Sequence, residues 1–243
     1  MKLKDLREEV CEANLDLVRR GLVIEAFGNV SGIDRERDIV AIKPSGVDYR
    51  QLRPQSLVLT DLDGNIVDGS LRPSSDLPTH LVLYAAFPRT GGIAHTHSLF
   101  ATVWAQARLD IPCFGTTHAD YFPGPIPTTG PLASKDILTD YEINTGRAIV
   151  HRLQKLDPDA FSAALVASHG PFCWGRSATD AVHTAAMVEQ LAKMAYYTVV
   201  LNPNASAITS ELRDKHFFRK HGPTAYYGQE RPRPSANRRN RRS

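Results

Sequence analysis

The spacing of apolar residues along the chain predicts six helices. In residues 3–20 apolar side chains recur every three or four positions, the period of an amphipathic helix, and Gly21 follows as a stop. The same period recurs in five further segments, which are 77–87, 98–107, 136–153, 178–201 and 211–220. The segments 136–153 and 178–201 are the longest of these patterns.

Short apolar runs between these segments predict strands. Residues 39–42 form one such run and lead into a turn at 43–46. Residues 56–60 and 65–67 flank the turn sequence 61–64, a pattern typical of a hairpin. Two more runs, 92–96 and 163–170, carry a histidine next to their last residue. Because strands and helices alternate without a regular strand–helix–strand repeat, we predict a single α/β domain with a largely antiparallel sheet between helices.

Composition changes sharply near the end of the chain. Residues 230–243 contain six arginines, one glutamate and no apolar residue larger than alanine, so we predict a folded domain over 1–229 and a disordered basic tail over 230–243. The tail carries a charge of +5 while the whole chain carries +3, which leaves −2 for the body. The body therefore gives no sign of a nucleic-acid-binding surface.

The remaining bulk properties indicate a cytoplasmic protein with one core. The 243 residues are 42% hydrophobic, which suffices for one sizeable core, and no apolar stretch is long enough to cross a bilayer. The polar N-terminus does not look like a signal peptide. Three widely spaced cysteines without a CxxC motif are typical of buried thiols in a reducing compartment.

The most informative motif is the pair His95 and His97, at the end of the run 92–96. Successive side chains of a strand alternate between its faces, so these two imidazoles project from the same side. Two unpaired imidazoles on an apolar strand are costly to bury. Their convergence on one metal ion would remove that cost, so we predict a metal site here.

A third imidazole, His169, ends the second apolar run. Three histidines suit an open catalytic site, whereas structural zinc sites usually close with cysteines. Histidine and carboxylate donors also accept manganese or cobalt. A lone histidine is most often an ordinary surface or core residue, and we interpret four others in that way: His80, His151, His183 and His221.

Ser74, Ser75 and Asp76 stand directly before the predicted helix 77–87. In the simplest interpretation Ser75 or Asp76 caps the helix, with Pro78 in its first turn. A helix N-terminus with two hydroxyl groups also binds phosphate well, and Asp76 could add an oxygen ligand to the metal. These two interpretations are compatible.

Three further segments carry polar groups. We interpret 28–32 and 43–46 as small-residue turns, each a weak signal alone, which would form an anion cradle together with the two serines. Residues 116–121 lie in a long loop, 113–131, and loops of that length tend to be functional. Asp120 could act there as a general acid or base oriented by His118, although sequence alone favours a solvated loop carboxylate.

Taken in order, the motifs resemble those of the class II aldolase/epimerase superfamily, and within it the L-ribulose-5-phosphate 4-epimerases. The resemblance covers about Leu3 to Gln229. It rests on GNVS at 28–31, KPSGVDY at 43–49, PSSD at 73–76, HTH at 95–97, GTTHADY at 115–121, SHGPF at 168–172, KH at 215–216 and AYYGQ at 225–229.

The resemblance implies a three-layer αβα fold of the class II aldolase type. It implies Zn²⁺, or Mn²⁺ or Co²⁺, on Asp76, His95, His97 and His169. It implies phosphate contacts from Asn29, Lys43, Ser45, Gly46, Ser74 and Ser75. It further implies a cyclic homotetramer with active sites between subunits, in which Asp120 and Tyr227 act from the neighbouring chain, with His216 nearby.

The reaction implied by the resemblance is epimerisation at C4 of L-ribulose 5-phosphate to D-xylulose 5-phosphate, a step shared by arabinose and ascorbate degradation. Carbon 4 is not acidic, so the C3–C4 bond breaks in a retro-aldol step and re-forms on the other face. Two acid/base groups on opposite faces, Asp120 and Tyr227, would handle the proton of the 4-oxygen. The alternative is a class II sugar-phosphate aldolase that releases dihydroxyacetone phosphate, but such aldolases carry a longer glutamate in place of Asp76.

A non-catalytic alternative gives the metal a structural role and lets the basic tail recruit RNA or an acidic protein. The all-histidine set argues against it, because such a set leaves room for an exchangeable ligand. We therefore expect a small sugar phosphate as the partner, and neither a membrane nor a nucleic acid.

Overall fold

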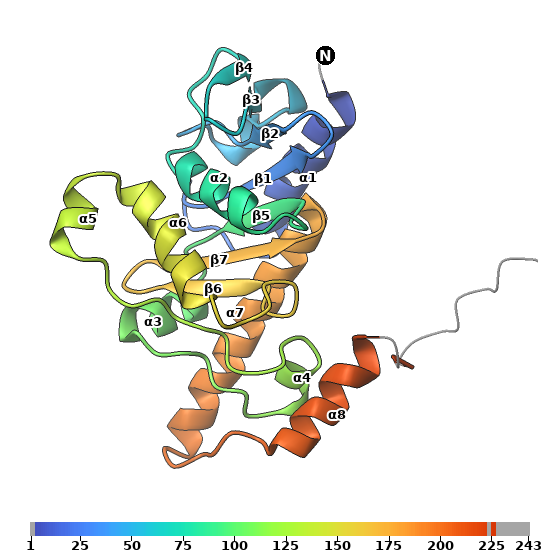
Figure 1. Cartoon of the computed structure of the whole chain (residues 1–243), viewed down its shortest axis with the longest axis vertical. Helices are drawn as coiled ribbons and strands as arrows, with labels where there is room; N and C mark the ends of the chain where they lie inside the picture. The colour runs from blue at the N-terminus through green and yellow to red at the C-terminus, as the bar shows by residue number, and fades with distance from the viewer. Residues whose placement is uncertain (1–2, 223–224, 227–243) are drawn as a thin grey trace, which may run out of the picture.

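A computed structural model describes residues 3–222 and 225–226 (Figure 1). At its centre lies one seven-stranded sheet in the order β4-β3-β2-β1-β5-β7-β6, in which all neighbours are antiparallel. The strands are β1 (Asn29–Asp34), β2 (Ile39–Ile42), β3 (Val58–Thr60), β4 (Ile66–Asp68), β5 (Gly92–His95), β6 (Ala163–Val166) and β7 (Gly170–Gly175). The predicted antiparallel sheet is confirmed.

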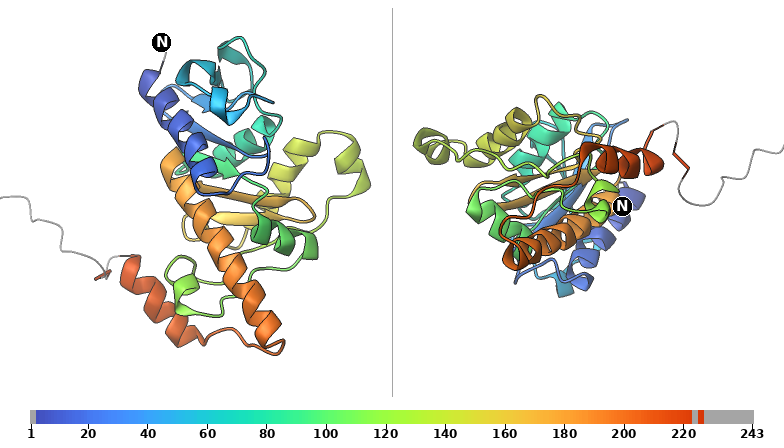
Figure 2. Two further views of the ribbon diagram at one scale, coloured as in Figure 1. Left: turned by 180° about the vertical axis from the view of Figure 1, so that it is seen from behind. Right: turned by 90° about the horizontal axis from the view of Figure 1, so that it is seen from below.

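Helices cover both faces of the sheet (Figure 2). On one face pack α1 (Lys4–Arg19), α3 (Leu99–Ala107) and α7 (Ala178–Leu201); on the other pack α2 (Leu77–Ala86) and α6 (Tyr141–Arg152). Alternate strand residues enter separate cores, as Ala41 does on the first face and Val40 and Ile42 do on the second. The three-layer αβα fold is thus confirmed, and two buried faces explain why the strands are apolar without strict alternation.

The predicted helix 136–153 is two helices, α5 (Ser134–Leu138) and α6. Thr139 between them has φ −108° and ψ −105°, outside the helical region, and its hydroxyl donates to the Lys135 carbonyl at 3.0 Å. The prediction of one helix was wrong because apolar spacing continues across this break and does not reveal it. Tyr141 and Glu142 therefore lie at a helix N-terminus instead of inside a helix.

The segment 28–32 is not a turn, because residues 29–34 form β1 in the middle of the sheet. Its small residues serve packing: a Cβ on Gly32 would lie only 2.7 Å from Cγ2 of Val10, so its absence lets α1 approach the strand. Within this segment, only Gly28 has a backbone conformation that favours glycine, with φ +121°.

Both histidine runs are shorter than predicted. Strand β5 ends at His95, and His97 lies in the connection to α3. The run 163–170 leaves its strand at Val166, so His169 lies in the tight turn between β6 and β7, after Ser168 at φ +63°. Strand β3 likewise begins at residue 58 and not at 56, because residues 54–56 form a turn of 3₁₀ helix.

Two helices lie beyond the end of the sheet. The long loop 113–131 contains the short helix α4 (Thr116–Ala119), and α8 (Ser210–Lys220) packs on it near the far end of α7 (Figure 1). Among the described residues, no helix combines the length and apolarity needed to span a bilayer. Tyr227 and the predicted tail 230–243 lie outside the described residues.

Candidate metal centre and substrate cavity

A cavity of about 390 Å³ gathers the residues predicted to bind metal and phosphate. Its walls come from β1, from the end of β5, from the β6–β7 turn and from the N-termini of α2 and α6. All ten of those residues line it: Asn29, Lys43, Ser45, Gly46, Ser74, Ser75, Asp76, His95, His97 and His169. Segments far apart in sequence therefore meet in one place.

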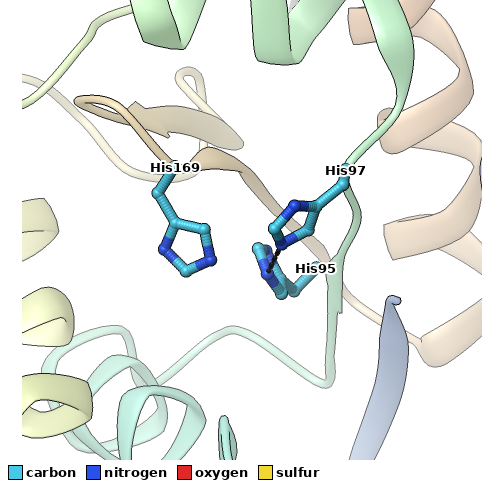
Figure 3. A group of neighbouring side chains, drawn as sticks. All are labelled: His95, His97 and His169. Carbon is cyan, nitrogen blue, oxygen red and sulfur yellow. Dashed lines mark hydrogen bonds between the residues drawn. The ribbon is translucent and has the colours of Figure 1, made fainter. Parts of the chain in front are cut away.

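The three imidazoles point toward a common centre (Figure 3). Their ligand atoms all lie within 4.8 Å of one another, and Nε2 of His95 lies 3.2 Å from Nε2 of His97. Two nitrogens bound to a tetrahedral zinc ion at 2.0–2.1 Å would be about 3.3 Å apart. The His95–His97 pair thus has the separation that a tetrahedral metal ion requires, and His169 faces the same centre.

The tautomer of His95 is fixed by its surroundings. Its Nδ1 lies 2.9 Å from the Pro171 carbonyl, which can only accept, so Nδ1 carries the proton and Nε2 keeps its lone pair. On His169, Nδ1 lies 3.3 Å from the hydroxyl of Tyr141. Phe172 stacks on the His95 ring at 4.1 Å between centroids and so holds its plane.

All three imidazoles are neutral at physiological pH. Burial lowers the pKa of His95 and His97, and burial together with the other two histidines lowers the pKa of His169 to about 4. Metals bind the neutral imidazole, so no proton has to be displaced from these nitrogens. The chemistry of this donor set therefore suits a divalent metal.

Asp76 occupies the N-cap position of α2 and Pro78 lies in the first turn, as expected, but the Asp76 side chain accepts no capping hydrogen bond. The Asp76 backbone is itself helical, with φ −77° and ψ −4°, whereas a capping residue is usually extended. Its Oδ2 instead accepts from Nδ2 of Asn29 at 2.6 Å. Burial raises the pKa of Asp76, but His95, His80 and the Asn29 hydrogen bond lower it more, and the net pKa is below normal. An ionised carboxylate therefore lines the cavity, although it lies outside the tight group of three histidines.

The residues predicted to form a phosphate cradle lie on two segments that are hydrogen-bonded to each other. The Ser45 amide donates to the Arg72 carbonyl and the Ser74 amide to the Lys43 carbonyl, both at 3.0 Å. Lys43 is only 3% exposed, and its Nζ lies 4.7 Å from the centre of the Tyr49 ring. Burial lowers the pKa of Lys43, which a phosphate dianion in the cavity would counteract.

The predicted acid/base residues meet elsewhere, where α8 packs on α4. Asp120 Oδ1 lies 3.0 Å from Nδ1 of His216, Arg219 contacts both carboxylate oxygens at 3.1 and 2.8 Å, and Lys220 Nζ lies 3.2 Å away. Burial raises the pKa of Asp120, but these three partners outweigh it and the net pKa is lowered. Among the described residues of this chain, none of this cluster lines the metal cavity.

His118 does not orient Asp120, contrary to our expectation. Its buried ring directs Nε2 to the Gly124 carbonyl at 2.9 Å, which ties the long loop to itself. The side chains of α8 take over the orienting role instead. The resemblance had placed His216 near Asp120, but residue spacing alone did not, because 96 positions separate the two residues.

The sequence analysis missed four residues that also line the cavity: Ala26, Phe27, Tyr141 and Glu142. Tyr141 and Glu142 stand at the start of α6, and Phe27 directly precedes Gly28, with its ring 5.7 Å from that of His97. If the break at Thr139 had been predicted, Tyr141 and Glu142 would have been recognised as residues at the start of a helix. Phe27 carried one signal, its position directly before the motif at 28–31.

Comparison with known proteins now decides the family. Residues 8–196 match the Class II Aldolase and Adducin N-terminal domain. The chain belongs to the class II aldolase and adducin family. It shares 50% identity over 228 residues with L-ribulose-5-phosphate 4-epimerase UlaF of Salmonella paratyphi C (strain RKS4594) and with that of Salmonella choleraesuis (strain SC-B67); this is 94% of our chain and 100% of each relative.

Solved structures of this family share the fold. An L-fuculose 1-phosphate aldolase superposes with a TM-score of 0.77 at 25% identity, over 90% of this chain and 97% of that one. YgbL from Klebsiella pneumoniae, a putative aldolase/epimerase/decarboxylase, superposes with a TM-score of 0.70 at 24% identity, over 88% and 99%. The predicted resemblance to the class II aldolase/epimerase superfamily is confirmed.

Proposed function

We propose that this protein is a metal-dependent L-ribulose-5-phosphate 4-epimerase, which interconverts L-ribulose 5-phosphate and D-xylulose 5-phosphate. The full-length match at 50% identity to proteins of that name supports the reaction. The observation that carries the proposal is the cavity itself, which joins a three-histidine group to a lysine- and serine-lined cradle. A metal next to a phosphate site is what a phosphorylated ketose requires.

We assign the metal site to His95, His97 and His169, with Asp76 as a fourth, oxygen donor. Zinc is our first candidate, and manganese or cobalt would also suit these donors. When bound, the metal supplies a Lewis acid that stabilises negative charge on the C2 and C3 oxygens of the substrate. Asn29, which donates to Asp76 at 2.6 Å, holds the carboxylate in place.

The remaining chemistry falls to the side chains. A base removes the proton of the 4-hydroxyl, the C3–C4 electron pair passes to the dihydroxyacetone fragment as an enediolate, and C4 becomes the aldehyde of glycolaldehyde phosphate. The phosphate cradle retains this aldehyde while it turns to present its other face. The bond then re-forms and an acid returns the proton to the 4-oxygen, so the reaction is balanced without a redox partner.

We assign the acid/base roles to Asp120 and Tyr227, with His216 beside Asp120. Because Asp120 and His216 do not line the cavity of their own chain, we propose that they serve a neighbouring subunit in a cyclic homotetramer. Exposed apolar side chains on the end of α7 and on α8 suit such contacts; they include Met194, Tyr197, Val200, Leu201 and Phe218.

The wider assignments follow the same account. We propose a catalytic domain over 1–229 and a basic tail over 230–243, which agrees with the match of whole relatives to 94% of this chain. Three free, buried cysteines suit a reducing cytoplasm. A sugar phosphate is the expected partner, and neither nucleic acid nor membrane is required.

The test is incubation of zinc-loaded protein with L-ribulose 5-phosphate and coupled detection of D-xylulose 5-phosphate. The proposal predicts turnover that a chelator abolishes and zinc restores. Cleavage of a deoxy-sugar 1-phosphate to dihydroxyacetone phosphate, without epimerisation, would instead make the protein an aldolase like its structural neighbour.

A further inference from the structure

Helix α2 lies beside strand β1, and polar side chains join the two at regular intervals. Asp76, His80 and Tyr84 follow one another at single helical turns, while Asn29 and Ser31 are alternate residues on one face of β1. Four residues of helix rise about 6 Å and two residues of strand about 6.8 Å. Asn29 therefore lies opposite Asp76, and Ser31 lies opposite His80. The first connection, between Asn29 and Asp76, belongs to the metal cavity.

The second connection lies deeper and has no role in the account so far. Ser31 Oγ is 2.7 Å from Nδ1 of His80 and 2.8 Å from the hydroxyl of Tyr84. All three residues are 0% exposed, and Leu83, Ile93 and Phe172 belong to the same side of the core. Three polar groups in an apolar core destabilise the fold unless their hydrogen bonds are ordered.

His80, Ser31 and Tyr84 together hold one more proton than the hydrogen bonds between them can use. His80 is fully buried, and burial disfavours the charged imidazolium, so the ring is neutral and carries one N–H. His80, Ser31 and Tyr84 then hold one mobile proton each and share two hydrogen bonds, which leaves one proton without a partner among them. It can reside on Nε2 of His80, on the Tyr84 hydroxyl or on the Ser31 hydroxyl.

The surroundings favour Nε2 of His80. On the Tyr84 side, the Arg35 guanidinium lies 5.4 Å from the ring centre, and no described residue offers the Tyr84 hydroxyl a second acceptor. On the His80 side, the carboxylate of Asp76 stands one helical turn earlier, where side chains are neighbours. Nε2 itself is buried and has no hydrogen-bond partner among the described residues. An N–H there is stabilised by the nearby anion, whereas a free hydroxyl proton on Tyr84 would face apolar core and a cation.

We propose that Tyr84 and Ser31 hold His80 in its Nε2–H tautomer, so that His80 presents a hydrogen-bond donor toward the Asp76 side of the metal centre. His80 is then a positioning residue that acts through Asp76, and not the ordinary core histidine of the sequence analysis. The inference rests on the metal site of the proposed function, but the tautomer itself does not.

The first experiment measures that tautomer directly in metal-free protein labelled with ¹⁵N-histidine. Long-range ¹H–¹⁵N correlations distinguish Nε2–H from Nδ1–H rings, and the His80 signals are assigned by their loss in His80→Gln. We expect the Nε2–H form in the wild type and a shift toward Nδ1–H in Ser31→Ala, which removes the donor to Nδ1. An Nδ1–H ring in the wild type overturns the proposal whether or not the protein is an epimerase.

The second experiment measures zinc affinity by competition with a chelator. We expect Ser31→Ala to bind zinc about 10–100-fold more weakly, the effect typical of residues that support metal ligands, and Tyr84→Phe to show a smaller loss. Thr60→Val is the matched control, because it removes a buried hydroxyl of β3 that has no partner among the described residues. Thermal unfolding of each variant confirms that it is folded.

Rescue separates positioning from packing. His80→Gln keeps an N–H near the place of Nε2 and His80→Met does not, so the glutamine variant should bind zinc more tightly. Equal affinities in Ser31→Ala and Thr60→Val would overturn the positioning role. A wild type that binds no zinc would overturn the metal centre itself, while the tautomer measurement still decides the arrangement of Tyr84, Ser31 and His80.

Discussion

Two regions of the molecule carry the residues assigned to chemistry, and they are built in different ways. The metal cavity collects its side chains from strands and turns of the sheet, and the second nitrogens of His95 and His169 face Pro171 and Tyr141. The Asp120 cluster lies where α8 packs on α4, beyond the sheet, and its single carboxylate faces His216 and two cations.

The difference teaches which parts of an active site one chain can complete. Every group that we assign to metal or phosphate lines one cavity of a single chain. Asp120 has an oriented carboxylate, but it does not line the cavity of the three histidines among the described residues of its own chain. On this account the Asp120 cluster, the acid/base half of the site, becomes functional only when chains assemble. Substitutions in it and in the metal cavity, the metal half, should therefore have separate effects.

The largest effect should come from breaking the metal half. His97→Asn removes one ligand, so zinc affinity should collapse and epimerase turnover should fall about a thousandfold or more. Metal content and the coupled assay measure both quantities. His151→Asn, which changes an exposed histidine, should leave both unchanged. Full zinc content in His97→Asn would disprove the ligand assignment.

Loss of the proposed acid/base group should lower the turnover without lowering the zinc affinity. Asp120→Asn removes the proposed proton carrier, so kcat should fall by about 10²–10⁴ while zinc affinity stays at the wild-type value. Steady-state kinetics and chelator competition test this, with Asp159→Asn, an exposed ion-paired carboxylate, as control. A parallel loss of zinc would show that the two regions are not independent.

A smaller effect should follow from weakening the phosphate cradle. Lys43→Met removes one charge-assisted contact, worth about 1.5–3 kcal/mol, so KM should rise about 10–100-fold with a lesser change in kcat. Inhibition by inorganic phosphate should weaken in parallel. The exposed Lys155→Met serves as control, and an unchanged KM in Lys43→Met would remove this lysine from the cradle.

The smallest effect should appear in stability against pH. The pKa of Asp120 is lowered in the folded state, so its partners stabilise the fold above the unfolded pKa of about 3.9, and this contribution is lost as pH falls through the lowered value. Asp120→Asn should therefore lower Tm modestly at pH 6 and lose that effect in more acidic solution. Thermal unfolding over this range tests the sign, and a Tm difference independent of pH would contradict it.

The sequence predicted the parts of the site that depend on local geometry. His95 and His97 converge as alternation required, even though the strand ends at His95. Apolar periodicity indicated a largely antiparallel sheet between helices, and the family resemblance implied the three layers. Asp76 was placed at the helix start correctly, but its preference for Asn29 over the helix amides depends on a strand 47 positions away.

Longer-range arrangements escaped prediction for the same reason. The small residues of β1 indicated a turn, because only the approach of α1 shows why Gly32 lacks a side chain. The break at Thr139 hid Tyr141 and Glu142, and the orienting partners of Asp120 come from α8. Sequence patterns report the near neighbours of a residue, whereas these features depend on contacts between distant segments.

The division of the active site between subunits can be tested most directly by mixing two inactive proteins. His97→Asn retains an intact acid/base half and Asp120→Asn an intact metal half, and the two are unfolded and refolded together at equal concentration. If neighbouring chains share sites, the mixture should recover about a quarter of wild-type turnover, because random assembly restores that fraction of sites. A mixture as inactive as its components would show that Asp120 does not serve the metal cavity of another subunit.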